Sequence, residues 1–456
     1  MNFSLTVRDL HQLYDKLRCF HDKYTSHFMS KTRDVIKQSF QYIHGKFLEM
    51  GDGNMESYAE NVPDCNSQSL QHFVSNSPWD HESVLDHIQR DVTQCIGDRK
   101  NGALHVDESG FPKQGNDSVG VQSQYCGRLG KVANCQVGVF LGYSKGQYRT
   151  LIDERLYLPE EWVEDNVRRE KCGVPGDVVF KKKVELAWEM ICHAKKNNVP
   201  FGWIGMDCFF GRDSWLRDKI DSEGMLYIAD IPCDTLVWLE CPKTGMPLRK
   251  EGHRGRPPTR RQVLPGEPSP YNVKFLVTIL RKDQWRHIFV RDTERKELWA
   301  DIAAVRVYPC VDGLPGKECW LIIRKDDGEK KVKYQFSNAS LKASISRLSQ
   351  MSCSRFWIER AFEDGKGIAG LADYQVRSWT GWHHHMTMTL MAMLFILMLM
   401  LDMSDLADLL TVQDIKEILE VIMPKKDISD EQLLHLILKK HKARDSARRS
   451  HHKRNK

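Results

Sequence analysis

Three acidic residues are placed where they could share a divalent metal ion. Asp107 and Asp207 each end a strand-like segment, and Glu359 lies in a segment, 355–366, that has a helical pattern. Two aspartates at strand ends and one glutamate on a helix can form a cage of hard oxygen ligands. Such cages hold the metal ions with which proteins cut and rejoin phosphodiester backbones. These three residues are therefore the candidate catalytic and metal-binding site.

The helical segment adds two cations to this site. Arg355 and Lys366 are four and seven residues from Glu359, so the three side chains share one helix face. An arginine can hold a phosphate through two hydrogen bonds beside a metal that the glutamate holds. The alternative is an exposed helix with ordinary Arg–Glu and Glu–Lys pairs, and each aspartate alone could be a solvated strand end.

The segments around the aspartates follow the order strand, strand, strand, helix, strand, helix, strand. That order is typical of a ribonuclease-H-like domain, in which the first and fourth strands are neighbours and would bring Asp107 to Asp207. The predicted fold class is therefore α/β with such a catalytic domain. The predicted segments are Gly102–Asp107, Asn134–Tyr143, Tyr148–Tyr157, Lys182–Asn197, Phe201–Asp207, Asp213–Ser222 and Met225–Ile231.

The remaining patterns divide the chain further. Apolar residues at helical spacing predict helices before residue 100, and two more helices, Val412–Met423 and Asp430–Lys440, near the other end. Thr411 and Asp414 are a candidate capping box for the first of these two. Strand-like segments between the second aspartate and the glutamate helix predict a β-rich insertion; they are Val273–Ile279, Trp285–Arg291, Ala303–Val307 and Trp320–Arg324.

These patterns predict five parts of the chain. They are a helical N-terminal domain (1–100), the first part of the catalytic core (101–231), the β-rich insertion with a basic Pro/Gly loop (232–340), the second part of the core with a continuous helix Ile345–Gly367 (341–405), and C-terminal helices with a basic tail (406–456).

Basic residues are only slightly in excess but gather in two segments. The 456 residues include 67 Lys and Arg against 61 Asp and Glu. Lys439–Lys456 holds nine basic residues and one acidic residue, and the loop 240–270 carries Arg254, Arg256, Arg260 and Arg261 among prolines and glycines. Both segments could lie on DNA phosphates. A plain basic linker and a solubilising tail are the alternatives.

Cysteine usage and hydropathy favour a cytoplasmic protein. The 13 cysteines include no Cys-x-x-Cys pair, which argues against a disulfide framework or a zinc ribbon. The first residues lack the basic start and long apolar core of a signal peptide. The apolar run Met386–Leu401 has 16 residues, fewer than the roughly 20 that span a bilayer. We therefore expect a buried core helix there and no membrane partner.

Two other motifs predict no separate chemistry. Gly127–Lys131 lacks the spacing of a phosphate-binding P-loop, and valine follows the lysine where serine or threonine is required. His383, His384 and His385 are adjacent, and adjacent side chains diverge on a helix. The histidine triplet by itself therefore does not predict a metal site.

Several longer motifs resemble bacterial DDE transposases of insertion sequences. The first runs His-Val-Asp-Glu-Ser-Gly-Phe-Pro-Lys-Gln-Gly from His105, and the second begins Ser-Val-Gly-Val-Gln-Ser-Gln-Tyr-Cys at Ser118. Ile-Glu-Arg-Ala-Phe from Ile358 and Tyr-Gln-Val-Arg-Ser-Trp from Tyr374 continue the likeness. It covers roughly residues 70–400 and is nearest to the insertion-sequence family numbered 701, within the hairpin-forming DDE superfamily endonucleases.

This resemblance implies a transposase that binds the ends of its element and performs metal-dependent strand cleavage and strand transfer. It implies Asp107, Asp207 and Glu359 as the catalytic triad, with Mg²⁺ as cofactor and Mn²⁺ able to substitute. The family signature has Tyr, Arg, Glu and Lys at fixed spacing; Arg355, Glu359 and Lys366 match it, and Ser352 stands at the Tyr position.

The expected partners follow from the same resemblance. They are double-stranded DNA, at the element ends and the target, and further copies of the chain in a homodimer or higher oligomer. A bacterial cytoplasmic protein that is nucleoid-associated when bound to DNA is expected. The alternative is a catalytically inactive protein that binds element ends without cleaving them.

Overall fold

One large mixed sheet organises the computed structural model, which describes residues 3–29, 34–48, 53–246, 260–292, 297–329, 331–427 and 429–454. Its thirteen strands follow the order β10-β7-β12-β14-β15-β6-β5-β1-β3-β2, with β4 beside β3 and with β11 and β13 beside β12. The strands are β1 (Gly102–Pro112), β2 (Gln122–Cys126), β3 (Lys131–Lys145), β4 (Tyr148–Tyr157), β5 (Trp203–Met206), β6 (Tyr227–Ile231), β7 (Leu236–Trp238), β10 (Tyr271–Asn272), β11 (Arg286–Asp292), β12 (Glu297–Val311), β13 (Leu314–Pro315), β14 (Cys319–Asp326) and β15 (Val332–Ser337). A separate pair is formed by β8 (Thr244–Gly245) and β9 (Gln262–Val263).

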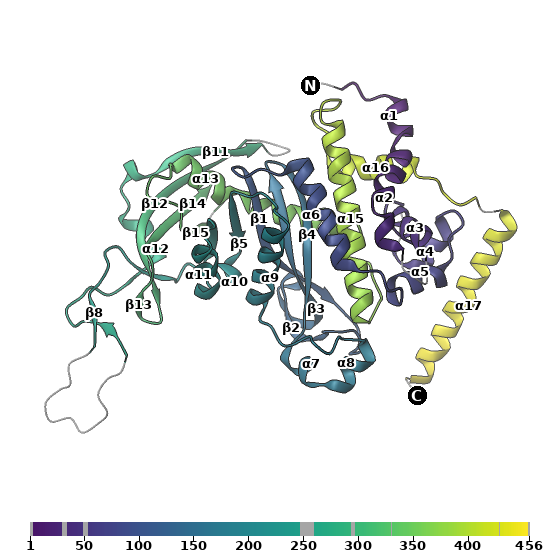
Figure 1. The fold of residues 1–456 in the computed structure, drawn as a ribbon, viewed down its shortest axis with the longest axis horizontal. Helices are drawn as coiled ribbons and strands as arrows, with labels where there is room; N and C mark the ends of the chain where they lie inside the picture. The colour runs from purple at the N-terminus through teal and green to yellow at the C-terminus, as the bar shows by residue number, and fades with distance from the viewer. Residues whose placement is uncertain are drawn as a thin grey trace.

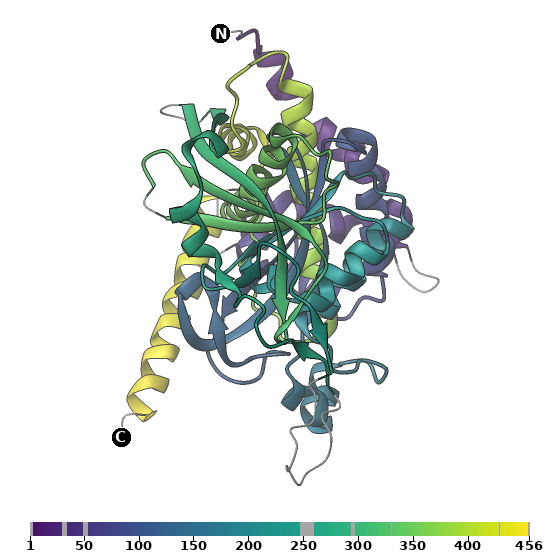
Figure 2. The same cartoon turned by 90° about the vertical axis from the view of Figure 1, so that its left-hand side faces the viewer.

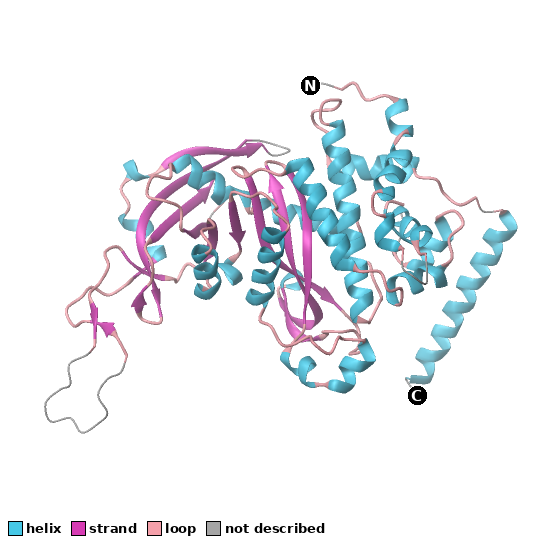
Figure 3. Cartoon of the chain, in the orientation of Figure 1, coloured by secondary structure: helices cyan, strands magenta, loops and turns pink. Residues whose placement is uncertain are grey.

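Helices lie mainly at one end of the molecule, beyond β4, and strands at the other, as Figure 3 shows. The helices before the sheet are α1 (Val7–His11), α2 (Leu13–Asp22), α3 (Ile36–Lys46), α4 (Met55–Asn61), α5 (Ser67–Ser75) and α6 (His81–Ile96). Those within and after it are α7 (Glu160–Glu164), α8 (Asn166–Cys172), α9 (Lys183–Lys196), α10 (Cys208–Gly211), α11 (Ser214–Ser222), α12 (Val273–Ile279), α13 (Ile345–Ser354), α14 (Phe356–Gly367), α15 (Trp379–Met403), α16 (Val412–Ile422) and α17 (Asp430–Arg454).

The central strands have the neighbours that the sequence predicted for the two aspartates. β1 is antiparallel to β3 and parallel to β5, and β5 is parallel to β6. Val106 of β1 is in register with Met206 of β5. The strand that ends before Asp207 therefore lies directly beside the strand that carries Asp107, as expected.

The strands of the predicted insertion continue this sheet. β15 pairs with β6, and β14 and β12 follow in turn. One predicted strand is wrong: Val273–Ile279 is helix α12, because the Asn272 side chain caps its first turn by accepting a hydrogen bond from the Lys274 amide at 3.1 Å. Val273 and Leu276, three residues apart, are its buried residues, which is helical rather than alternating spacing.

The glutamate helix is two helices. α13 ends at Ser354 and α14 begins at Phe356, with Arg355 between them in a helical conformation. The prediction of one continuous helix is wrong at this point. The division sets Arg355 at the start of α14, one turn before Glu359.

The long apolar helix α15 is the core element on the far side of the sheet. It lies between β4 and the N-terminal helices α3 and α5, as Figure 1 shows, and it also packs on α6. By length and composition it could cross a membrane, but 78% of its most apolar window is buried inside the protein. The expected core helix is therefore confirmed.

The end of the chain forms two helices. Thr411 and Asp414 make the expected capping box of α16: the Thr411 amide donates to Asp414 Oδ2 at 2.8 Å, and the Asp414 amide donates to Thr411 Oγ1 at 3.2 Å. α17 is longer than predicted and runs away from the body of the molecule in both views (Figures 1 and 2).

Candidate active site

Three aspartates lie at the same level of three neighbouring strands. The prediction that a strand ends at Asp107 is wrong, because β1 continues to Pro112 through its pairing with β3; Asp230 also lies within its strand, and only Asp207 follows the end of one. Val106, Met206 and Ala229 are in register across the parallel strands β1, β5 and β6. The next residues along the chain are Asp107, Asp207 and Asp230. Because parallel strands in register place equivalent residues side by side, the three carboxylates gather at one edge. Asp230 was not among the predicted site residues, although its strand was predicted.

Hydrogen bonds fix how these carboxylates point. Asp207 caps α10, and its Oδ1 accepts hydrogen bonds from the amides of Phe209 and Phe210, each at 3.0 Å. Asp107 Oδ1 accepts from the Glu108 amide at 2.7 Å. Asp230 Oδ1 accepts from Gln335 Nε2 of β15 at 2.6 Å. Each aspartate therefore has one oxygen held by the protein, and its second oxygen is available to a cation.

Arg355 occupies the centre of this group. Its Nε lies 2.8 Å from Asp230 Oδ2, its Nη1 lies 3.5 Å from Asp107 Oδ2, and its Nη2 pairs with Glu359 Oε1. The Arg355 side chain is 23% exposed and that of Glu359 is 51% exposed. The glutamate helix thus meets the sheet through Arg355, and the group opens to solvent at Glu359. We call Asp107, Asp207, Asp230, Glu359 and Arg355 the Arg355 cluster.

The crowding of like charges shifts the pKa values in this cluster. Burial raises the pKa of Asp107 to about 7, and the Asp207 carboxylate adds to the rise while Arg355 opposes it. Burial also raises the pKa of Asp207, against its hydrogen bond from Phe210. For Arg355, burial acts against the charge, but Asp230, Asp107 and Glu359 outweigh it and raise the pKa. The cluster is therefore short of positive charge even with Arg355 in place.

The donor set of the Arg355 cluster fits a hard divalent cation. It consists of carboxylate oxygens without histidine or cysteine, and one side of it is open to water. Magnesium prefers oxygen ligands of this kind and keeps several waters. The pKa of Asp107 indicates a site where added positive charge would be stabilised.

Lys366 and Ser352, two other residues of the family signature or its positions, lie outside the Arg355 cluster. Lys366, at the end of α14, is partly buried with its Nζ 5.3 Å from the Phe362 ring centroid, and burial lowers its pKa. Ser352 is buried in α13, and its carbonyl accepts hydrogen bonds from Arg324 and Gln335. The side chain at the family's Tyr position therefore lies in the interior.

The predicted basic loop is described only in part. Arg254 and Arg256 lie outside the described residues. Arg260 and Arg261 are exposed beside β9, and Arg261 Nη2 donates to the Thr244 carbonyl oxygen at 3.1 Å. Neither contacts the Arg355 cluster in the described part of the chain.

A groove beside Asp207 is a feature that the sequence did not predict. It has a volume of about 740 Å³ and is lined by Lys182, Lys183, Arg212 and the 39% exposed Phe209, among others. Phe209 and Arg212 follow Asp207 in α10 and its cap, and Lys182 and Lys183 begin α9. Cations with an exposed aromatic ring are typical of surfaces that bind single-stranded nucleic acid.

Comparisons with known proteins agree with this chemistry. Residues 26–297 match the family model described as DDE superfamily endonuclease. The chain is 29% identical over 195 residues to a probable transposase for insertion sequence element IS701 from Microchaete diplosiphon, a match of 42% of this chain and 48% of that protein. The match thus spans about half the length of that relative.

A piggyBac transposase, solved in a synaptic complex with hairpin DNA, also overlaps the chain. The overlap covers 91% of this chain and 78% of that one, at 10% identity and a TM-score of 0.38, and at that score it supports no argument about the fold. The family model, by contrast, matches more than half of the chain and includes Asp107 and Asp207. This protein therefore belongs to the DDE superfamily endonucleases and is similar to the transposases of insertion sequences.

Proposed function

We propose that this protein is a transposase that binds the ends of its insertion sequence and carries out metal-dependent DNA cleavage and strand transfer. The observation that supports this most strongly is the register of β1, β5 and β6, which gathers Asp107, Asp207 and Asp230 at one edge opposite Glu359. The strand order β4-β3-β1-β5-β6, with β1 and β5 parallel, supports a ribonuclease-H-like core within the sheet.

Asp107, Asp207 and Glu359 are the residues we propose as catalytic and metal-binding. Enzymes of this superfamily use divalent metal ions, and we propose Mg²⁺, with Mn²⁺ able to replace it. When bound, such an ion stabilises charge on the phosphoryl oxygens and makes the attacking hydroxyl more acidic. Asp230 shares the edge with the triad, and its part is to hold Arg355.

Arg355 would connect the carboxylates to the DNA substrate. It neutralises the acidic group, since it pairs with Asp107, Asp230 and Glu359. Asp107, Asp207 and Glu359 would hold the metal ion, and the Arg355 guanidinium, oriented by Asp230, would donate two hydrogen bonds to the scissile phosphate.

DNA would extend from this point along basic surfaces. The groove with Lys182, Arg212 and Phe209 can receive a displaced strand next to Asp207, because it offers both charge and a stacking ring. Lys366, the loop with Arg254, Arg256, Arg260 and Arg261, and the tail in α17 would bind the duplex through its phosphates.

The assembly we propose is a homodimer or higher oligomer on double-stranded DNA, because two element ends must be joined to one target. The protein would act in the cytoplasm, on the nucleoid. Residues 1–100 would recognise the element ends, 101–231 and 341–405 would form the catalytic core around the insertion 232–340, and 406–456 would add DNA contacts.

The test is cleavage of element-end DNA by purified protein with Mg²⁺. Asp107→Asn, Asp207→Asn and Glu359→Gln should each lose cleavage to the background level while still binding the DNA, because each removes one ligand charge from the cage. Glu363→Gln is the matched control, since Glu363 lies one turn further along α14 and pairs with Arg360.

Native cleavage rates in Glu359→Gln would overturn the assignment of Glu359. A wild-type protein that binds element ends but cleaves with neither Mg²⁺ nor Mn²⁺ would instead identify the inactive end-binding protein.

A further inference from the structure

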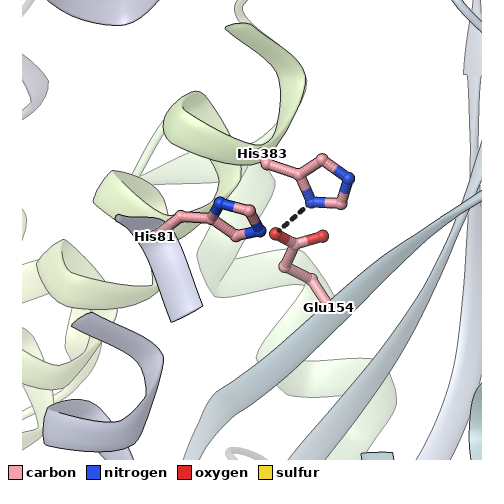
Figure 4. Close-up of side chains that lie close together, drawn as sticks. All are labelled: His81, Glu154 and His383. Atoms are coloured by element: carbon pink, nitrogen blue, oxygen red, sulfur yellow. Dashed lines mark hydrogen bonds and ion pairs between the residues drawn. The ribbon is translucent and has the colours of Figure 1, made fainter. Parts of the chain in front are cut away.

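A second group of potential metal ligands lies inside the protein, apart from the Arg355 cluster. His81 of α6, Glu154 of β4 and His383 of α15 each offer one ligand atom, and these atoms lie within 4.8 Å of one another. Figure 4 shows the two imidazole rings lying beside the Glu154 carboxylate. The rings are stacked, with centroids 4.6 Å apart. We call these three residues the Glu154 cluster.

Polar atoms of this cluster are buried without partners. The side chains of Glu154 and His383 are 0% and 3% exposed. His383 Nδ1 lies 2.8 Å from Glu154 Oε1, but Glu154 Oε2 and His383 Nε2 have no hydrogen-bond partner among the described residues. Burying a carboxylate is costly unless a cation or a full set of hydrogen bonds accompanies it.

The two cations near Glu154, Arg155 and His193, form ion pairs with other acids. Arg155 pairs with Asp153 at 2.6 Å and with Glu82 at 3.4 Å. His193, whose pKa is raised to about 9 by Asp153 and Asp86 against burial, lies 2.7 Å from each of them. Four acids, Glu82, Asp86, Asp153 and Glu154, thus share two cations, and burial raises the pKa of Glu154 well above its usual value.

The histidines of the cluster place ligand atoms against the acid. Their nitrogens and a Glu154 oxygen lie within 4.8 Å of one another, and imidazole nitrogen is a common metal ligand. Among the described residues, the His383 ring is the ion-pair partner that Glu154 has, and neither Lys nor Arg pairs with its carboxylate.

From these contacts we infer that His81, Glu154 and His383 form a binding site for one Zn²⁺-like divalent cation, separate from the proposed Mg²⁺ site. Two imidazole nitrogens and one carboxylate oxygen are a donor set that zinc accepts in proteins, whereas Mg²⁺ favours oxygen alone. Glu82 Oε1 lies 3.8 Å from His81 Nε2 and can supply a fourth ligand, as can water. The positive charge of the ion would offset the cost of burying the Glu154 carboxylate.

The neighbouring histidines show why only one member of the triplet takes part. His385 lies between the Tyr42 hydroxyl at 2.7 Å and the Gly370 carbonyl at 3.1 Å. His384 lies between the backbone carbonyls of Val74 and Trp79 at 2.9 and 3.0 Å. Each ring nitrogen of these two histidines therefore has a polar neighbour in the core, and none of those neighbours is a carboxylate. His383 alone points to an acid, and its partner His81 lies about 300 residues earlier in the sequence.

The inferred cation would tie three elements together. It would join the last helix before the sheet, α6, to the edge strand β4 and to the core helix α15. Glu154 is in register with Phe140 of β3, which is in register with Asp107 of β1. The Glu154 cluster is thus two strands, or about 10 Å, from the proposed catalytic aspartate. Its role is to fix the helical end of the molecule to the catalytic sheet.

The experiment uses the full chain, treated with chelator and then titrated with Co²⁺ or Zn²⁺ in excess Mg²⁺. Excess Mg²⁺ fills the oxygen-only site and competes poorly for imidazole. Wild type and Glu359→Gln should each bind one equivalent of Co²⁺ with a visible absorption band, and Zn²⁺ should raise their Tm. His81→Gln and Glu154→Gln should bind no Co²⁺ at this site, and Zn²⁺ should not raise their Tm.

Two results would overturn the inference: no bound Co²⁺ or Zn²⁺ in wild type at micromolar concentrations, or binding that survives in His81→Gln. The first would identify a neutral, protonated Glu154 hydrogen-bonded to His383. If Glu154→Gln does not fold, His81→Gln decides, because His81 is partly exposed. Glu359→Gln keeps this test independent of the proposed catalytic function.

Discussion

The Arg355 cluster and the Glu154 cluster solve the same electrostatic problem in opposite ways. Both gather acids on one face of the sheet, at positions in register with Phe140. The Arg355 cluster contains an arginine and opens to solvent at Glu359, whereas the Glu154 cluster is mostly buried and contains neither Lys nor Arg. In our proposals, Arg355 can neutralise the first group of acids by itself, and the second group would depend on the inferred ion.

The largest expected effect comes from removing the resident cation. Arg355→Gln leaves Asp107, Asp230 and Glu359 without their shared partner, so we expect a lower Tm in the absence of metal, and a larger rise in Tm with Mg²⁺ than in wild type. Single-turnover cleavage should fall further than DNA affinity, because the guanidinium also contacts the scissile phosphate in our proposal. Thermal melts with and without Mg²⁺ and cleavage of prebound DNA measure both effects.

Two milder variants sharpen this result. Arg355→Lys keeps the charge but loses the fork, so its Tm should stay close to wild type while cleavage falls. Lys366→Ala should reduce cleavage less than Arg355→Lys, since a point charge is easier to replace. If affinity drops in these variants and cleavage of the bound complex does not, both residues belong to general DNA attachment.

An intermediate effect concerns pH. The pKa of Asp107 is raised from 3.8 to about 7 in the folded protein, mainly by burial and then by Asp207. The metal-free folded state therefore binds more protons than the unfolded state between these values, so the contribution of Asp107 to stability falls as pH rises through that window. Mg²⁺ needs the ionised form, so its stabilising effect should grow from pH 6 to pH 8.

Melting curves at several pH values, with and without Mg²⁺, measure this growth. In Asp107→Asn the pH dependence of the Mg²⁺ effect should be much flatter. A Zn²⁺-induced Tm shift in the Glu154 cluster should not follow the titration of Asp107, which separates the two sites. A Mg²⁺ effect that is equal at pH 6 and pH 8 in wild type would contradict the raised pKa.

The smallest effect on the chemistry is expected from the distant basic segments. Removing Lys439–Lys456, or changing Arg254, Arg256, Arg260 and Arg261 to Gln, should weaken DNA binding and reduce its salt dependence. Each lost phosphate contact lowers the slope of log K against log salt by about one unit. Cleavage of the bound complex and Tm should stay unchanged, because α17 stands apart from the sheet in Figure 1. An unchanged slope would identify both segments as solvated.

The sequence predicted the parts of the fold that depend on local pattern. The alternation of strands and helices from Gly102 to Ile231 predicted that the strands before Asp107 and Asp207 are neighbours, which the register confirms. The apolar run in α15 was long and uniform enough to identify a core helix. The segment Val273–Ile279 was misassigned because its β-branched residues favour strands, and the Asn272 cap decides for a helix instead.

The parts that could not be predicted depend on distant contacts. Asp230 lies one residue before the end of a predicted strand and gave no signal of its own, since only its pairing with Arg355 assigns it to the cluster. Glu154 is an acid inside a strand, and no local pattern joins it to His81 and His383. Arg355 was expected to face phosphate, and its position among the carboxylates follows from the packing of α14 against the sheet.

Phe140 is in register with Asp107 on one side and with Glu154 on the other. This register limits where residues can be inserted into or deleted from the chain. The Phe140 ring packs on Phe362 of α14 and Trp382 of α15, the helices that carry Glu359 and His383. A residue inserted or deleted in β3 before Phe140 would turn that ring to the opposite face. Both clusters would then lose the same support at once. The turn at Gly127–Gly130, where β2 meets β3, does not support α14 or α15 in this way. Insertions and deletions should therefore be tolerated there during evolution.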